Sequence, residues 1–188
     1  VKYDWDNLIP GLMQNEIDVV IAGMTAIEDR KEVVNFTDPY YTSHEVIIVR
    51  KDSTLTSITD IQELKGKTVK GQLNTLYDTI IDQINGVKHG TAMESYPSLV
   101  NDLLNKGCDA ITAELPVAEG IVASNPDLTY VTFKEGHGFT ADTSVSIAVK
   151  KDNIELLNKL QKALNAISEE ERLQMMLEAV ERQPAENE

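Results

Sequence analysis

Three short segments carry polar groups at expected junctions between a strand and a helix. Residues 23–25 are followed closely by Arg30, residues 72–75 come after a second strand, and Glu114 ends a third. A guanidinium and backbone amides suit a carboxylate, whereas a carboxylate suits an ammonium group. These are the two charged ends of an α-amino acid. Each charge-assisted hydrogen bond contributes roughly 1.5–3 kcal/mol, so three or four would bring a small ligand towards micromolar affinity, about −8 kcal/mol.

Each segment also has a purely structural interpretation. Thr25 and Glu28 have the spacing of a capping box, and Arg30 would then be a surface residue that balances neighbouring acids. Asn74 tolerates a positive φ angle, which is common in turns between a strand and a helix. Glu114 is as suitable for capping a helix as for binding a ligand. Only the three segments together favour an amino-acid site.

Composition limits the possible functions. The chain has 188 residues, 41% of them hydrophobic, which is enough for one sizeable core or two small ones. Its net charge of −14 argues against nucleic-acid binding, which needs a basic patch. Cys108 is the only cysteine, so we expect no internal disulfide. His44, His89 and His137 lack the spacing of metal ligands, and we expect no metal and no cofactor.

Helical and extended patterns alternate along the chain, which predicts an α/β protein with mainly parallel sheets. The tail over residues 183–188 is polar, and we expect it to be frayed. The strands are expected at residues 17–22, 45–50, 68–71, 109–113, 128–133 and 145–150. The helices are expected at residues 4–15, 59–64, 76–84, 96–105, from Pro116 onwards, 153–167 and 169–182.

Several stretches resemble the polar amino acid family of ABC-transporter substrate-binding proteins, also called extracellular solute-binding protein family 3. The matching stretches are residues 5–12, 17–25, 36–41, 64–69, 107–118 and 145–151. The resemblance implies the type II periplasmic-binding-protein-like "Venus flytrap" fold, in which two hinge strands join two α/β lobes. Lobe 1 would comprise residues 1–47 and 145–188, and lobe 2 residues 48–144.

This sequence has no counterpart of the family's opening strand and helix, and it contains no signal peptide. We therefore expect lobe 1 to be incomplete and the start of the natural protein to be missing. An incomplete sheet would expose a strand edge, and association through lobe 1 is expected.

The resemblance implies roles for both ends of an amino acid. Arg30 would hold the ligand's α-carboxylate, helped by the amide of Thr75 or its neighbour. The backbone of Gly23, together with Thr25, would contact the ammonium group and one carboxylate oxygen. Glu114 would pair with the ammonium group, at a position where the family usually has aspartate.

The resemblance also implies which residues surround the ligand's side chain. Trp5 would cover it, although helix packing is the alternative role for this aromatic. Met24 and Gln72 would face the side-chain pocket, and Asn74 replaces the usual glycine of the family.

The expected function is to capture a free polar L-amino acid outside the cytoplasm and deliver it to the permease subunits of an ABC importer. Gln72 favours glutamine as the ligand. Periplasmic and lipoprotein forms both stay open. Alternatives are a sensory ligand-binding domain and a dehydratase of the same fold, although no convergent acid–base pair supports an enzyme. A pure interaction protein is the remaining possibility.

Overall fold

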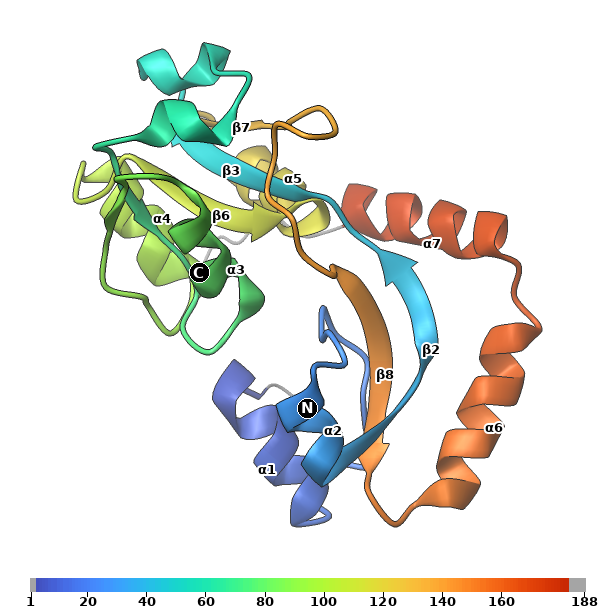
Figure 1. Cartoon of the computed structure of the whole chain (residues 1–188). Helices are drawn as coiled ribbons and strands as arrows, with labels where there is room; N and C mark the ends of the chain where they lie inside the picture. The colour runs from blue at the N-terminus through green and yellow to red at the C-terminus, as the bar shows by residue number, and fades with distance from the viewer. Residues whose placement is uncertain (1–2, 183–188) are drawn as a thin grey trace. The chain divides into compact units, whose positions relative to one another are not determined.

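The computed structural model describes residues 3–182, and the predicted frayed tail over residues 183–188 lies outside them (Figure 1). The chain divides into two compact units. Unit 1 joins the segment that ends at Ser43 to the segment Asp142–Glu181, and unit 2 contains His44–Ala141. The chain therefore passes twice between the units. The lobe boundaries expected from the sequence, 47/48 and 144/145, remain a prediction.

Unit 1 is built on a three-stranded antiparallel sheet. The strand order is β1 (Val19–Val20), β8 (Ser144–Lys150) and β2 (Val34–Thr42). The predicted strand at 145–150 is confirmed, whereas the one predicted at 17–22 is reduced to two residues. The long strand β2 was not predicted. β1 pairs with β8 alone, so it forms one edge of this sheet.

Helices cover the sheet of unit 1. They are the 3₁₀ helix η1 (Trp5–Asn7) and the α-helices α1 (Leu8–Met13), α2 (Glu28–Val33), α6 (Ile154–Asn165) and α7 (Glu169–Glu181). The core between α1 and the sheet contains Leu12, Val20, Met24, Val34 and Ala148. Ser168 and Glu171 form the reciprocal side-chain-to-backbone bonds of a capping box at the start of α7.

Unit 2 is built on a five-stranded sheet. The strand order is β5 (Lys88–His89), β4 (Thr68–Lys70), β6 (Ala110–Glu114), β3 (Glu45–Arg50) and β7 (Leu128–Val131). β4 is parallel to both of its neighbours, and β3 is antiparallel to both of its own. The helical segments of this unit are η2 (Thr54–Ser57), η3 (Ile61–Leu64), α3 (Leu76–Thr79), η4 (Ile80–Gln83), α4 (Tyr96–Leu104) and α5 (Leu115–Ser124).

The prediction of mainly parallel sheets is wrong for unit 1, whose sheet is antiparallel, and holds only in part for unit 2, where β3 runs against the other four strands. The helices do connect parallel strands, because β6 and β7 are joined through α5 and run in the same direction. However, β3 lies between these two strands and runs against both. β3 enters this sheet directly from β2, which belongs to the sheet of unit 1, and not through a helix of unit 2. The order of helices and strands alone does not reveal this direction.

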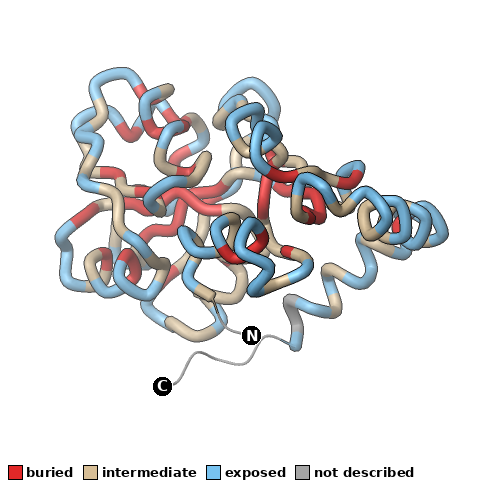
Figure 2. The backbone as a smooth tube through the Cα atoms, turned by 90° about the horizontal axis from the view of Figure 1, so that it is seen from below, coloured by how far each residue is buried: buried red, intermediate tan, exposed pale blue. Residues whose placement is uncertain are grey.

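The core of unit 2 lies on both faces of its sheet. Residues 46–49 of β3 are all completely buried, with Ile47 and Val49 packed into one cluster and Val46 and Ile48 into the other. Figure 2 colours the whole backbone by burial, with the buried residues in red. A strand with apolar residues at every position is typical of one covered on both faces.

Gly71 lies where strand β4 meets the backbone of α3. A Cβ atom at this position would lie 2.6 Å from the Cα and 2.7 Å from the amide nitrogen of Asp78. Backbone atoms cannot move aside as a flexible side chain can. Glycine therefore allows α3 to pack directly against the end of β4.

We predict that Gly71→Ala destabilises the protein by about 2–3 kcal/mol through this overpacking, as measured by urea unfolding. Gly66→Ala is the control, because Gly66 has φ +75 but open space around its Cβ position. We expect the control to lose about 1 kcal/mol from backbone strain alone. Equal losses in both variants would contradict the close-packing argument.

Candidate functional site

Arg30 and Trp5 are predicted site residues of unit 1 that lie in contact with each other. The guanidinium carbon of Arg30 lies 5.5 Å from the centroid of the Trp5 ring, which is cation–π geometry. Arg30 Nη1 also donates a hydrogen bond of 3.0 Å to the carbonyl oxygen of Thr25. Burial lowers the pKa of the Arg30 guanidinium, but arginine remains charged in proteins. These contacts hold a planar, half-buried cation of the kind that binds carboxylates in a bidentate manner.

The predicted capping box between Thr25 and Glu28 is wrong. The N-cap residue of α2 is Ile27, which is extended and has no capping side chain. Glu28 forms an ion pair of 2.8 Å with Lys31. The helix starts later than expected because the carbonyl of Thr25 accepts bonds from Ile27 N and from Arg30. The bond from Ile27 N to Thr25 O closes a turn centred on Ala26, and α2 begins after this turn.

Met24 and Gly23 lie in the turn after β1. The Met24 side chain is 1% exposed and belongs to the core of unit 1, whereas its carbonyl accepts a bond of 3.0 Å from Ser146 N. The hydroxyl of Tyr40 donates to the carbonyl of Ala22 at 2.7 Å. The backbone on either side of Gly23 is therefore fixed. The predicted contact of the Met24 side chain with a ligand stays a prediction, and here this side chain serves in packing.

Trp5 contributes to packing as well as to the Arg30 contact. It is partly buried and packs against the cluster that contains Leu12 and Met24. Both of the roles considered for Trp5 are therefore compatible with its position. As the only tryptophan of the chain, it is also a single fluorescent reporter next to Arg30.

The loop over residues 71–75 contains the site residues predicted for unit 2, Gln72, Asn74 and Thr75. Asn74 has φ +58, as its residue type led us to expect. The hydroxyl of Thr75 donates to the carbonyl of Gln72 at 2.7 Å, and Leu73 N donates to Met93 O at 2.8 Å. The predicted long helix after this loop consists of α3, with only four residues, and η4.

Gln72 is bound to the neighbouring segment of unit 2. Its Nε2 donates to the carbonyl of Glu94 at 3.1 Å, and its backbone forms a parallel bridge with Met93. Sequence reasoning had assigned no role to Met93 and Glu94, since neither follows a motif. Together these two residues support the loop over residues 71–75.

Glu114 ends β6 and occupies the N-cap position of α5, but its side chain makes no capping hydrogen bond. Within the described residues, no hydrogen bond or ion pair joins its carboxylate to another group. Burial raises the pKa of this carboxyl to about 7. Burial and then the charge of Glu114 also raise the pKa of the Tyr96 hydroxyl. A buried carboxylate in this state is stabilised by an incoming cation such as an ammonium group.

We predict that Glu114→Gln stabilises the protein above pH 7 and leaves its stability unchanged below about pH 4.5. The folded-state pKa is raised from 4.5 to about 7, so wild-type stability falls as pH rises through this window. At pH 8 the variant should be more stable by about 3 kcal/mol. Urea unfolding at several pH values measures the difference.

Glu135, which is exposed, offers a matched control. Glu135→Gln should follow the wild-type pH dependence. Parallel stability curves for wild type and Glu114→Gln between pH 4.5 and pH 8 would contradict the buried state of Glu114.

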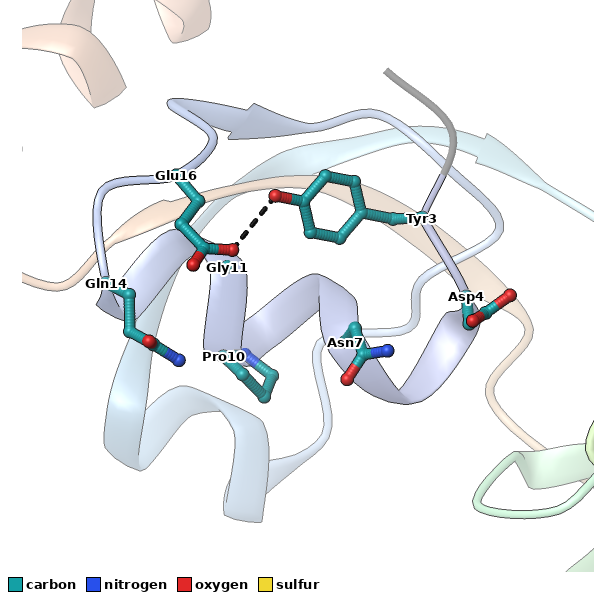
Figure 3. A pocket seen from close by; sticks show the side chains of 7 residues that line it. All are labelled: Tyr3, Asp4, Asn7, Pro10, Gly11, Gln14 and Glu16. Atoms are coloured by element: carbon teal, nitrogen blue, oxygen red, sulfur yellow. Dashed lines mark hydrogen bonds between the residues drawn. The ribbon is translucent and has the colours of Figure 1, made fainter.

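A separate pocket lies at the start of unit 1, and none of the sequence-predicted site residues lines it (Figure 3). The hydroxyl of Tyr3 donates to a carboxylate oxygen of Glu16 at 3.0 Å across this pocket. That hydrogen bond raises the pKa of the Tyr3 hydroxyl. The lining residues are Tyr3, Asp4, Asn7, Pro10, Gly11, Gln14 and Glu16. They lack a cation for binding a carboxylate.

Two further searches cover the part of the chain that the structure describes. No group of three or more His, Cys, Asp or Glu side chains there is arranged to hold a metal ion. Among the helices of residues 3–182, none has both the length and the apolar character needed to cross a membrane.

A family model described as "Bacterial extracellular solute-binding proteins, family 3" matches residues 1–179. The chain therefore belongs to this family of extracellular solute-binding proteins. The bilobed α/β fold expected from the sequence agrees with this assignment and with the solved structures that the chain resembles.

Two curated relatives are arginine-binding proteins. The chain is 32% identical over 166 residues to ABC transporter arginine-binding protein 1 of Escherichia coli strain K12, covering 88% of this chain and 67% of the relative. It is 33% identical over 176 residues to the arginine-binding extracellular protein ArtP of Bacillus subtilis strain 168, covering 92% and 66%. The chain thus spans about two thirds of the length of these relatives.

One solved structure extends the comparison to the fold. It is the crystal structure of an amino acid ABC transporter substrate-binding protein from Streptococcus pneumoniae bound to L-arginine. The TM-score is 0.84 at 27% identity, covering 100% of this chain and 77% of the other. These relatives are binding proteins rather than enzymes.

Proposed function

We propose that this chain is the ligand-binding part of an extracytoplasmic receptor, periplasmic or lipid-anchored, that delivers a free polar L-amino acid to the permease of an ABC importer. Membership of the solute-binding family and the names of the relatives support this proposal. The proposed role is binding without catalysis. We favour it over the sensory-domain and dehydratase alternatives.

The observation that carries the proposal is the largely buried carboxylate of Glu114, which no hydrogen bond or ion pair within the described residues satisfies. A ligand ammonium group would supply the missing counter-charge. In the proposed complex, Arg30 holds the α-carboxylate with the help of the amide of Thr75. Gly23 and Thr25 contribute backbone and hydroxyl contacts. These are charge-assisted hydrogen bonds, the strong class for small-ligand recognition.

The proposed side-chain pocket involves Trp5, Met24, Gln72 and Asn74. An amide at Gln72 suits a polar ligand side chain, which is the basis for favouring glutamine. Arginine is an equally direct candidate, because relatives that cover most of this chain are arginine-binding proteins. Both ligands carry the same α-amino and α-carboxylate groups, so the proposed roles of Arg30 and Glu114 apply to either.

In the proposed mechanism, ligand binding closes the two lobes. A ligand shifts a conformational equilibrium only by its difference in affinity for the two states. The ligand would contact both lobes in the closed state alone, and the permease would recognise that state. Closure by hinge bending needs only a few residues that change their φ and ψ angles.

We predict that a thermal-shift screen against the twenty L-amino acids identifies one or two polar ligands. A ligand at about 100 times its dissociation constant adds roughly 2.7 kcal/mol, or about 5–10 °C for a protein of this size. Arg30→Ala should weaken binding of the identified ligand at least about a hundredfold, since the carboxylate would lose its charged partner. Calorimetry or Trp5 fluorescence would measure the affinity.

Lys31→Ala is the matched control, because Lys31 adjoins Arg30 in the chain and pairs with the exposed Glu28. We expect the control to keep the parent affinity. An Arg30→Ala affinity within threefold of the parent would contradict the role of Arg30. If no amino acid shifts the melting temperature, the screen should be repeated on a chain as long as the arginine-binding relatives before the receptor role is rejected.

We also propose that the chain associates with a second copy through the edge of β1. This strand pairs with β8 on one side only, and Ile21, which follows it, is 62% exposed. Met13 at the end of α1 is 49% exposed. Unpaired strand edges beside exposed apolar side chains promote pairing between chains.

The prediction is concentration-dependent dimerisation, measured by sedimentation velocity. Ile21→Lys should shift the equilibrium towards monomer, because a charge at a strand edge opposes pairing. Ile154→Lys is the control, since Ile154 is similarly exposed, at 49%, but lies on α6. A wild-type chain that stays monomeric at all concentrations would overturn this proposal.

A further inference from the structure

His89 is held between two aspartates in unit 2. Its Nε2 lies 2.9 Å from Asp78 Oδ1, and its Nδ1 lies 2.8 Å from Asp82 Oδ1. Asp78 belongs to α3 and Asp82 to η4, whereas His89 ends the edge strand β5. One side chain therefore links three separate elements.

Both contacts require a charged imidazole. An ionised carboxylate only accepts hydrogen bonds, so each ring nitrogen of His89 must donate one, and both nitrogens carry hydrogen only in the imidazolium form. Burial lowers the pKa of His89, but the two aspartates outweigh this effect, and the pKa is raised above its ordinary value of 6.5. The arrangement is thus that of the protonated state.

The elements linked by His89 are those that support the loop over residues 71–75. Asp78 N donates to Thr75 O at 3.3 Å, and the backbone of α3 packs on Gly71. The hydroxyl of Thr112 donates to the carbonyl of Tyr77 in the same helix. On the other side, the segment that begins with His89 continues to Met93, whose carbonyl accepts from Leu73 N.

We propose that protonated His89 is a positioning residue for this loop, so that ligand binding weakens as the histidine loses its proton. The inference rests on the proposed function only in assigning ligand contacts to the loop. The position of the loop itself depends on His89 through the contacts described above.

Few other charged groups face His89. Val69 is its partner on β4, and the next residue of that strand, Lys70, forms an ion pair of 2.9 Å with Asp102. Lys88 on β5 is exposed. Asp78 and Asp82 are therefore the groups that respond to the charge of His89. As pH rises through the raised pKa of His89, the neutral ring keeps a donor for only one of them, and stability present below pH 6.5 is lost.

Amide hydrogen exchange of the ligand-free protein at pH 6 and pH 8, corrected for intrinsic exchange rates, tests the proposal directly. We expect protection of the Leu73 and Asp78 amides to fall about three- to fivefold in the wild type, a modest effect because the His89 side chain is 29% exposed. The amide of Asp109, which donates to Thr68 O at 2.8 Å, should keep its protection.

Three variants separate charge from packing. His89→Arg carries a permanent cation and should keep the loop amides equally protected at both pH values. His89→Gln should show low protection at both. His137→Gln is the matched control, because His137 contacts a single aspartate, Asp60, at 2.9 Å away from the loop. It should behave as the wild type does.

The proposal is overturned if wild-type loop protection does not change with pH, or if His89→Gln shows the same pH dependence as the wild type. The affinity for L-arginine or L-glutamine of the wild type relative to His89→Arg provides a second readout, because both proteins share the titration of Glu114 in the same pH range. This ratio is expected to fall about three- to fivefold between pH 6 and pH 8. If neither amino acid binds, that result bears on the proposed function alone, and the exchange result still decides the role of His89.

Discussion

The burial of β3 on both faces is the constraint on which unit 2 depends. Val46–Val49 are fully covered, and β6 and β7 pair with this strand along both edges. The register places Glu45 opposite Glu114, so the pairing fixes where β6 ends and α5 begins. A shift of one residue would turn buried side chains to the opposite face of the sheet. The position of the Glu114 carboxylate is therefore set by apolar packing rather than by local polar contacts.

The amino-acid sequence predicted the strongly patterned elements well. The run Glu45–Arg50 is a strand with the expected bounds, because continuous β-branched residues between polar ends suit a strand buried on both faces. Sequence reasoning missed β2, where Pro39 and two register shifts interrupt the ladder with β8. It also predicted one helix over residues 76–84, although α3 and η4 divide that segment. These differences arise from pairing and packing across the fold, which local patterns do not contain.

The candidate site shows the same division between local and long-range information. The positive φ of Asn74 followed from its residue type, whereas the contact between Arg30 and Trp5 joins residues far apart in sequence. The capping pattern placed the start of α2 too early, whereas the helix begins at Glu28. The hydrogen bond from Arg30 to the Thr25 carbonyl cannot be recognised from such a pattern. Residue types thus indicated the chemistry of the site. The contacts that orient those residues required the three-dimensional structure.

Glu114 and His89 illustrate two opposite effects of ionisable groups in unit 2: charged Glu114 lowers stability, whereas charged His89 adds to it. Glu114 is held where its charged form is disfavoured, so the empty protein would be more stable with a neutral residue. Binding of a cation reverses that penalty, and the same burial that destabilises the free carboxylate strengthens its interaction with an ammonium group. His89 acts in the opposite sense, because its charged form is favoured and links α3 to β5. One group would thus be ready to accept a ligand charge, and the other would keep the neighbouring loop in position.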